Sequence, residues 1–225
     1  EGALVTLADI NTEEAEQVVT QVSDAGGSAV FCRADVTQSG DVKQMIEMAT
    51  STYGRLDGAF NNAGIEGAFT SITKMSEAEY DRTVNVDMKG VWLCLKYQVE
   101  AFLKQGSPGS IVSTASVAGL VGTRGGSAYC GAKHGVVGMT KSVALECARK
   151  AIRVNAVCPG VIQTPMVDRM TTEAGISAQA LVDQEPMERL GLPQEIAEAV
   201  VWLLSEQSSF VTGVAMPVDG GYIAV

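Results

Sequence analysis

The sequence predicts an α/β protein with one doubly wound parallel sheet and helices on both of its faces. Short apolar runs alternate with segments of helical periodicity from one end of the chain to the other. Parallel strands need long crossover connections, which are usually helices, so this alternation indicates a parallel sheet. No shift in composition marks an interior boundary, and residues 1–225 are therefore predicted to form a single domain.

The first half of the chain contains three predicted strands separated by helices. The strands are expected at residues 3–8, 29–32 and 56–60. Asn11 and Glu14 form a capping pair for the first helix, and Gly26 with Gly27 ends that helix. Apolar residues at positions 42, 45, 46 and 49 have helical spacing and predict a second amphipathic helix, which closes at Gly54.

The second half continues the same alternation. Strands are expected at residues 110–114, 152–158 and 214–218. Ser76 and Glu79 form a capping box that opens a helix extending to about Gln105. A long helix is predicted over residues 127–150, and the last helix begins at Pro193. The stretch before it is polar and carries Met166, Met170 and Met187, which could line an adaptable apolar lid over the substrate or be ordinary core or interface residues.

Composition excludes several classes of partner. Sixteen Lys and Arg against 26 Asp and Glu give a net charge of −10, which would repel phosphate backbones and anionic lipid. We therefore expect neither a nucleic acid nor a membrane as partner. Five scattered cysteines without a CxxC pair argue against zinc and against a secreted disulfide framework, and they fit the reducing cytoplasm. With a single histidine, His134, no metal site is predicted.

Two strands of the first half end in carboxylates, at the edge of the sheet where ligands of such folds bind. Asp9, followed by Ile10, can accept hydrogen bonds from both hydroxyls of an adenosine ribose and would repel a 2′-phosphate. NAD is therefore favoured over NADP. Asp35, followed by Val36, could bond an adenine amino group. The alternative for each aspartate is an ordinary cap or turn.

The third strand runs into Asn61, Asn62, Ala63 and Gly64. Small residues let a cofactor approach the backbone, and asparagine side chains can hold neighbouring loops in place. An ordinary turn is the alternative. The first half of the chain nevertheless has polar residues at three successive strand ends, which favours a common binding edge.

A possible proton-transfer group lies in the second half. Tyr129 and Lys133 are four residues apart on the predicted helix and so share one face of it. A phenol with a pKa near 10 is a poor base at neutral pH, and a nearby ammonium lowers that pKa. Ser116, just past the strand at 110–114, could hydrogen-bond the same substrate oxygen. Tyr129 would then exchange a proton with an alcohol.

Taken together, these residues resemble the short-chain dehydrogenase/reductase family, whose sheet is Rossmann-like, and the resemblance runs from residue 1 to residue 225. The matching positions in order are Asp9, Asp35, Val36, Asn61, Asn62, Ala63, Gly64, Asn85, Ser116, Tyr129, Lys133, Pro159, Gly160 and Thr164. The resemblance implies that Tyr129 is the general acid/base and that Lys133 lowers its pKa and holds the nicotinamide ribose. It implies that Ser116 orients the substrate oxygen. Asn85 would lie at a helix irregularity and anchor a water that relays protons to Lys133.

The resemblance also implies the cofactor contacts. Asn61 and Ala63 would line the adenosine ribose, next to Gly64. After the turn at Pro159 and Gly160, Ile162 and Thr164 would meet the nicotinamide carboxamide. Because this family usually assembles as tetramers, a homotetramer is implied as well.

One departure from the family pattern concerns the start of the chain. The family begins with a strand and a glycine-rich turn that places backbone N–H groups at the cofactor pyrophosphate. The sequence begins at the family's second strand, so about 30 residues of a βαβ unit would be missing. The chain is either a fragment of the working protein or a damaged copy, and the intact downstream positions favour the fragment.

The expected function is NAD-dependent interconversion of a secondary alcohol and a ketone, an oxidoreductase reaction at a CH–OH group with Tyr129 as general acid/base. The alternative is a non-catalytic relative that keeps the fold for interaction or regulation, which the missing glycine turn supports. A methyltransferase with a similar sheet ranks last, because it gives no reason for the spacing of Tyr129 and Lys133.

Overall fold

The computed structural model describes residues 2–172 and 177–224, and it confirms the predicted α/β fold with parallel strands. The strands are β1 (Leu4–Asp9), β2 (Ser28–Arg33), β3 (Gly58–Asn61), β4 (Gly109–Thr114), β5 (Ile152–Pro159) and β6 (Ala215–Val218). Every pair of neighbouring strands is parallel, as the alternating pattern requires.

Helices follow the strands as the sequence predicts. The main helices are α1 (Thr12–Asp24), α2 (Ser39–Tyr53), α3 (Glu77–Val84), α4 (Val91–Gln105), α5 (Ser127–Cys147) and α8 (Pro193–Leu204). The predicted caps are present, because Asn11 accepts the Glu14 N–H and Ser76 forms a reciprocal capping box with Glu79. Gly54 ends α2 in the left-handed conformation at φ 83°, which glycine adopts without strain.

Three stretches differ in detail from the expected elements. The helix expected from Ser76 to Gln105 is interrupted by a π-helical turn at Asn85–Gly90, between α3 and α4. The methionine-bearing stretch contains two short helices, α6 (Pro165–Thr172) and α7 (Ala178–Val182), which the polar pattern did not predict. The expected helix over residues 127–150 is α5 followed by a 3₁₀ turn, Ala148–Lys150.

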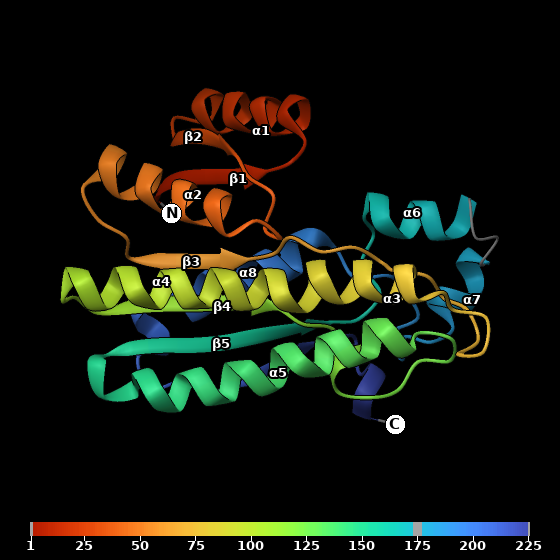
Figure 1. Ribbon diagram of the computed structural model, residues 1–225. Coiled ribbons are helices and arrows are strands. Elements are labelled where there is room, and N and C mark those ends of the chain that lie inside the picture. The colour runs from red at the N-terminus through yellow and green to blue at the C-terminus, as the bar shows by residue number, and fades with distance from the viewer. Residues whose placement is uncertain (1, 173–176, 225) are drawn as a thin grey trace.

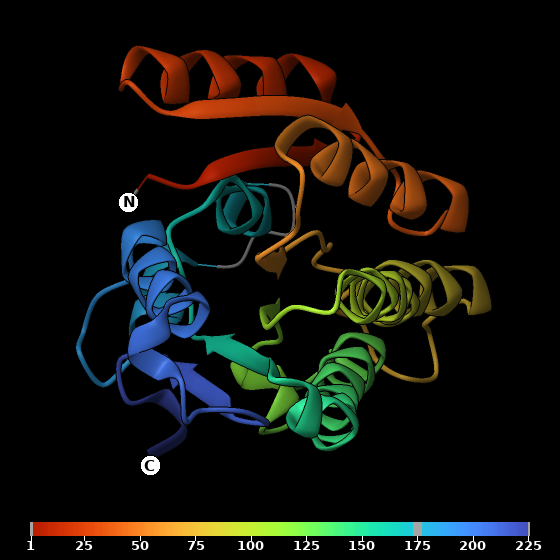
Figure 2. The same ribbon diagram turned by 90° about the vertical axis from the view of Figure 1, so that its left-hand side faces the viewer.

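The strands form two separate sheets. β1 pairs with β2, and β3 to β6 form a four-stranded sheet in the order β3-β4-β5-β6. In both ribbon views the β1–β2 pair, with α1, lies apart from the larger sheet (Figures 1 and 2). A cavity of about 1680 Å³ is lined by β1 on one side and by β3 on the other, so the facing edges of these two strands carry no ladder hydrogen bonds to each other. The predicted single sheet is thus divided at this point.

The core lies on both faces of the larger sheet. On one face Ile111 and Val154 pack against α4 and α5, with the fully buried Phe102 among them. On the other face Val112 and Val157 pack against Leu203 of α8. Figure 2 shows α8 on one side of the strands and α4 and α5 on the other. This doubly wound packing fixes the carboxyl ends of β3, β4 and β5 at one edge.

A buried amide pair joins β3 to α4. Asn61 donates to the Gln98 side chain at 3.1 Å, and Gln98 donates back at 2.6 Å. Both side chains are almost fully buried. Because buried amides are stable only when their donors and acceptors are paired, this reciprocal bond holds the end of β3 against α4.

Replacing Gln98 by leucine should destabilise the protein by about 1–3 kcal/mol, because the buried Asn61 amide loses both hydrogen bonds to Gln98. Denaturant unfolding measures this change. The matched control is Gln17→Leu on the exposed face of α1, which should change stability by less than about 0.5 kcal/mol. Equal stabilities of the two variants would contradict the structural role of the pair.

Candidate active site

The cavity between the sheets continues along the carboxyl ends of the strands and collects most of the predicted site residues. Those that line it are Asp9, Val36, Asn61, Ala63, Gly64, Ser116, Tyr129, Lys133, Pro159, Gly160, Ile162 and Thr164. Ile10, Asp35 and Asn85 do not line it. The structure therefore brings the Ser116, Tyr129 and Lys133 side chains together with both ends of the predicted cofactor path.

Tyr129 and Lys133 point to the same side of α5, as their spacing predicts. The Lys133 Nζ lies 5.4 Å from the centroid of the Tyr129 ring. The Phe69 ring packs beside the Tyr129 ring, and the two ring centroids are 6.1 Å apart. The Ser116 hydroxyl lies within hydrogen-bonding reach of the phenol and lowers the pKa of Tyr129. These contacts give the phenol one fixed position next to a hydroxyl and an ammonium.

Burial nevertheless dominates the acidity of the phenol. Burial, and after it the Asp87 carboxylate, raise the pKa of Tyr129 to about 12, which outweighs the hydrogen bond from Ser116. The shift is opposite to the one predicted from the Tyr129–Lys133 spacing. The first reason is that the phenol is buried, which the spacing argument did not include, and the second is the Asp87 carboxylate beside Lys133.

Lys133 is held by two partners inside the protein. Its ammonium donates to the Thr114 carbonyl at the end of β4, at 3.2 Å. It also lies 3.8 Å from the Asp87 Oδ1, and both side chains are almost fully buried. Burial lowers the pKa of Lys133, and Asp87 counteracts this. Sequence reasoning missed Asp87, although an acidic residue between Val86 and Met88 in a helix that packs on its neighbours is a signal for a buried charge.

The place beside Lys133 that the family resemblance gave to Asn85 is occupied by Asp87. The predicted helix irregularity is present, since the π-helical turn begins at Asn85. Asn85 itself lines a different, smaller pocket of about 410 Å³ together with Asp81, Arg82, Val84 and Lys89. Within this π-helical turn it is the Asp87 side chain, two residues after Asn85, that lies beside Lys133 of α5.

Two glycines allow this close packing. A Cβ on Gly64 would stand 2.8 Å from the Asp87 Oδ1 and 3.5 Å from the Lys133 Nζ. A Cβ on Gly119 would stand 2.7 Å from the Lys133 backbone oxygen. Any larger residue at either position would push the loops after β3 and β4 away from α5. The small residue predicted at Gly64 is therefore needed for the ion pair as much as for a cofactor.

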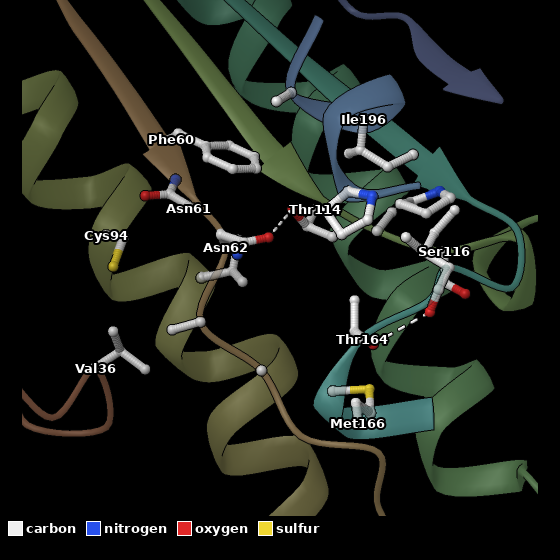
Figure 3. A pocket seen from close by; sticks show the side chains of 18 of the residues that line it. Val36, Phe60, Asn61, Asn62, Cys94, Thr114, Ser116, Thr164, Met166 and Ile196 are labelled. Atoms are coloured by element: carbon white, nitrogen blue, oxygen red, sulfur yellow. Dashed lines mark hydrogen bonds between the residues drawn. The ribbon is translucent and has the colours of Figure 1, made fainter. Parts of the chain in front are cut away.

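Other strand-end residues hold the loops of the site. Thr114 donates to the Asn62 side chain at 2.8 Å, which ties the end of β4 to the loop after β3 (Figure 3). In the same view Ser116, Thr164 and Met166 stand across the pocket from Val36 and Cys94. Near the mouth, Arg169 of α6 forms a bidentate ion pair with Glu66 at 3.0 and 3.2 Å. Met166 and Met170 line the pocket, whereas Met187 is 65% exposed and does not.

The residues at the two ends of the cavity fit a nicotinamide dinucleotide. The Oδ1 of Asp9, at the end of β1, accepts a hydrogen bond from the Asn11 N–H at 2.8 Å, and its Oδ2 accepts none from the described residues. Asp35 accepts the N–H and the hydroxyl of Thr37 with its Oδ1, and its contact with an adenine amino group stays a prediction. Ile162 and Thr164 line the far end, where the Thr164 hydroxyl donates to the Ile162 carbonyl.

Comparisons with known proteins agree with this geometry. A family model described as "Enoyl-(Acyl carrier protein) reductase" matches residues 1–223. The chain is 43% identical over 225 residues to "2,5-dichloro-2,5-cyclohexadiene-1,4-diol dehydrogenase" from Sphingobium indicum, covering all of this chain and 88% of that protein. The chain belongs to the short-chain dehydrogenase/reductase family. It is an oxidoreductase that interconverts an alcohol and a ketone, and the family uses nicotinamide cofactors.

Two solved structures of the family are close to this fold. The crystal structure of levodione reductase has a TM-score of 0.91 and 36% identity, covering all of this chain and 89% of that one. The structure described as "ElxO with NADP Bound" has a TM-score of 0.90 and 30% identity, covering 98% of this chain and 88% of that one. Among the described residues no helix has the length and apolarity to span a membrane, and none of their His, Cys, Asp and Glu side chains cluster as a metal site would require.

Proposed function

We propose that this family member oxidises alicyclic secondary alcohols, or reduces the matching ketones, with NAD and with Tyr129 as general acid/base. The observation that carries the proposal is the convergence of Ser116, Tyr129 and Lys133 in one pocket at the carboxyl ends of β4 and β5. The substrate class is supported by the dehydrogenase of a chlorinated cyclohexadienediol among its relatives. It is also supported by apolar side chains among those that line the same cavity, which include Phe69, Val117, Val161, Met166, Met170 and Leu181.

Proton transfer in this site follows from the contacts of Tyr129. In reduction, the protonated phenol donates its proton to the carbonyl oxygen as the alcohol forms, and Ser116 donates a hydrogen bond to the same oxygen. In oxidation, the phenolate removes the hydroxyl proton. A bound nicotinamide ring supplies or accepts the hydride. Because burial raises the pKa of Tyr129 to about 12, the phenol is protonated at neutral pH, and oxidation is expected to accelerate as the pH rises.

The preference for NAD rests on Asp9. Its carboxylate at the end of β1 is exposed and lines the cavity, and Ile10 beside it is 63% exposed and apolar. A carboxylate here accepts hydrogen bonds from ribose hydroxyls and repels a 2′-phosphate. Because the similar structure described as "ElxO with NADP Bound" contains NADP, the preference for NAD in this chain depends on residue 9.

The divided sheet supports a further proposal about the working protein: one more parallel strand, followed by a phosphate-binding turn, occupies the cavity between β1 and β3. Both strands offer unpaired edges to it, and apolar side chains such as Leu7, Ala59 and Ile46 line the space. An unpaired edge on each side of a slot is a template for a strand. The described residues contain no glycine-rich turn at this cavity that could hold a pyrophosphate.

We also propose that the protein forms a homotetramer and is located in the cytoplasm. Trp92 and Leu103 of α4 and Leu145 of α5 are large apolar side chains with exposed fractions of 48%, 49% and 82%. Such exposure on two adjacent helices favours burial against other copies of the chain. All five cysteines are free thiols, as the reducing cytoplasm would keep them.

The replacement Tyr129→Phe should lower turnover of an alicyclic alcohol by about 10²–10⁴-fold, because it removes the proton-transfer group and keeps the ring. Steady-state kinetics with cyclohexanediols and NAD measure the loss, and NADH fluorescence should show unchanged cofactor affinity. Tyr80→Phe, on the half-exposed Tyr80 of α3, is the matched control with unchanged turnover. Retained activity of Tyr129→Phe would remove this residue from the mechanism.

The replacement Asp9→Ala should weaken NADH binding by about 10–100-fold, since it removes a charge-assisted hydrogen bond, and should leave NADPH affinity equal or better. Fluorescence titration with both reduced cofactors gives the ratio. Asp24→Ala at the exposed end of α1 removes the same charge away from the cavity and should leave the ratio unchanged. An unaltered preference in Asp9→Ala would refute the cofactor argument.

The proposed additional strand predicts that the working protein is larger than 23.5 kDa, by about 30 residues. Intact-mass measurement of the protein purified from its natural source, followed by NADH titration, tests this. A protein of 23.5 kDa that binds NADH normally would contradict the proposal, because the cavity would then need no strand or turn.

A further inference from the structure

The buried carboxylate of Asp87 is a charged group of the site whose role the mechanism above leaves open. Its side chain is fully buried in the π-helical turn. Oδ1 accepts the Ile65 N–H at 2.9 Å and lies 3.8 Å from the Lys133 Nζ. Oδ2 has no hydrogen-bond partner among the described residues. A buried carboxylate is expensive to maintain unless a cation pairs with it, so its position next to Lys133 needs an explanation.

The residues around the Asp87 carboxylate hold it in one position. Gly64 gives it room, because a Cβ there would come within 2.8 Å of Oδ1. The π turn at Asn85–Gly90 places the side chain next to Lys133 of α5, and such turns are frequent at functional sites. Gly90 in the same turn packs against Val36, where a Cβ would meet the valine at 2.8 Å. The loop after β3 is therefore built closely around the Asp87–Lys133 pair, and the π turn that contains Asp87 is itself closely packed.

The charged groups that face the pair come from several elements. On α5, the Asp87 charge raises the pKa of both Lys133 and Tyr129. Glu66, in the loop after β3, raises the pKa of Asp87 and of Tyr129. The hydrogen bond to Arg169, and to a smaller extent the charge of Arg82 in α3, lower the pKa of Glu66 itself. On β5, Cys158 also raises the pKa of Lys133. Asp87 is thus the anion nearest to Lys133 in this set, at 3.8 Å.

We propose that Asp87 is a positioning residue that holds the Lys133 ammonium in place inside the protein and thereby sets the pH range in which Tyr129 exchanges its proton. The inference rests on the proposed function of Tyr129 and Lys133. The Thr114 carbonyl gives the ammonium a hydrogen-bond acceptor, and Asp87 gives it a counter-charge. The pair together is neutral, so Tyr129 lies beside an ion pair and not beside an isolated cation.

Removing this negative charge lowers the pKa of each neighbouring group. In Asp87→Asn, Lys133 loses its counter-charge and becomes deprotonated at lower pH, and the Tyr129 phenol loses a repelling anion and ionises at lower pH. Both limbs of the pH profile of kcat/KM for alcohol oxidation should therefore move to lower pH, by about 1 unit. A merely structural role would lower the rate at every pH and leave both limbs where they are.

The experiment compares the wild-type protein, Asp87→Asn and Asp87→Ser with Asp81→Asn, which removes the same charge from the exposed surface of α3. The serine variant removes the charge with a smaller side chain, so the test does not depend on one variant folding. Limbs that stay in place, or move to higher pH, in the folded Asp87 variants overturn the inference. Asp81→Asn should leave both limbs unmoved.

A second measurement needs no turnover. The ultraviolet absorbance of the Tyr129 phenolate is obtained as the difference between each protein and its Tyr129→Phe counterpart during a pH titration. Tyr129 should ionise about 1 pH unit lower in Asp87→Asn than in the wild-type protein. If no alicyclic alcohol is turned over, the proposed function fails while this titration still decides the role of Asp87. An unchanged ionisation of Tyr129 overturns the inference.

Discussion

The site is organised around the burial of one ammonium group. Lys133 has almost no exposed surface, and a buried ammonium is unstable without compensating partners. Its two partners come from separate elements, the Thr114 carbonyl at the end of β4 and the Asp87 carboxylate in the π turn. The approach of these segments depends in turn on Gly64 and Gly119, where a side chain would collide with the pair or with the α5 backbone. Much of the local architecture therefore follows from keeping this charge inside.

The sheet brings these segments to the same place. Parallel β3, β4 and β5 end at one edge, and the residues just beyond them form the loops that contain Asn62, Ser116 and Gly160. The bond from Thr114 to Asn62 joins two of these loops directly, and the Asn61–Gln98 pair anchors one of them to α4. Because the ligand edge is cross-linked in this way, the division between β1 and β3 leaves the proton-transfer end of the cavity intact.

Much of this could be predicted from the sequence, for identifiable reasons. Caps such as Asn11 and Ser76 depend on local hydrogen bonds, so they could be located from residue type and spacing alone. The shared face of Tyr129 and Lys133 depends only on helix geometry. The position of Asp87 beside Lys133 could not be assigned in this way, because periodicity does not reveal the π-helical turn at Asn85–Gly90.

The acidity of Tyr129 shows why spacing is a weaker guide to chemistry than to geometry. An ammonium one helical turn away stabilises a phenolate only if its charge is not already balanced and the phenol is not strongly desolvated. Here Asp87 balances the charge and burial desolvates the phenol, so the pKa of Tyr129 rises to about 12. A protonated phenol at neutral pH is a proton donor, which is the state that ketone reduction uses. The protonation state of this phenol near neutral pH is therefore set first by its burial and second by the Asp87 carboxylate, whose charge acts on Tyr129 as well as on the lysine beside it.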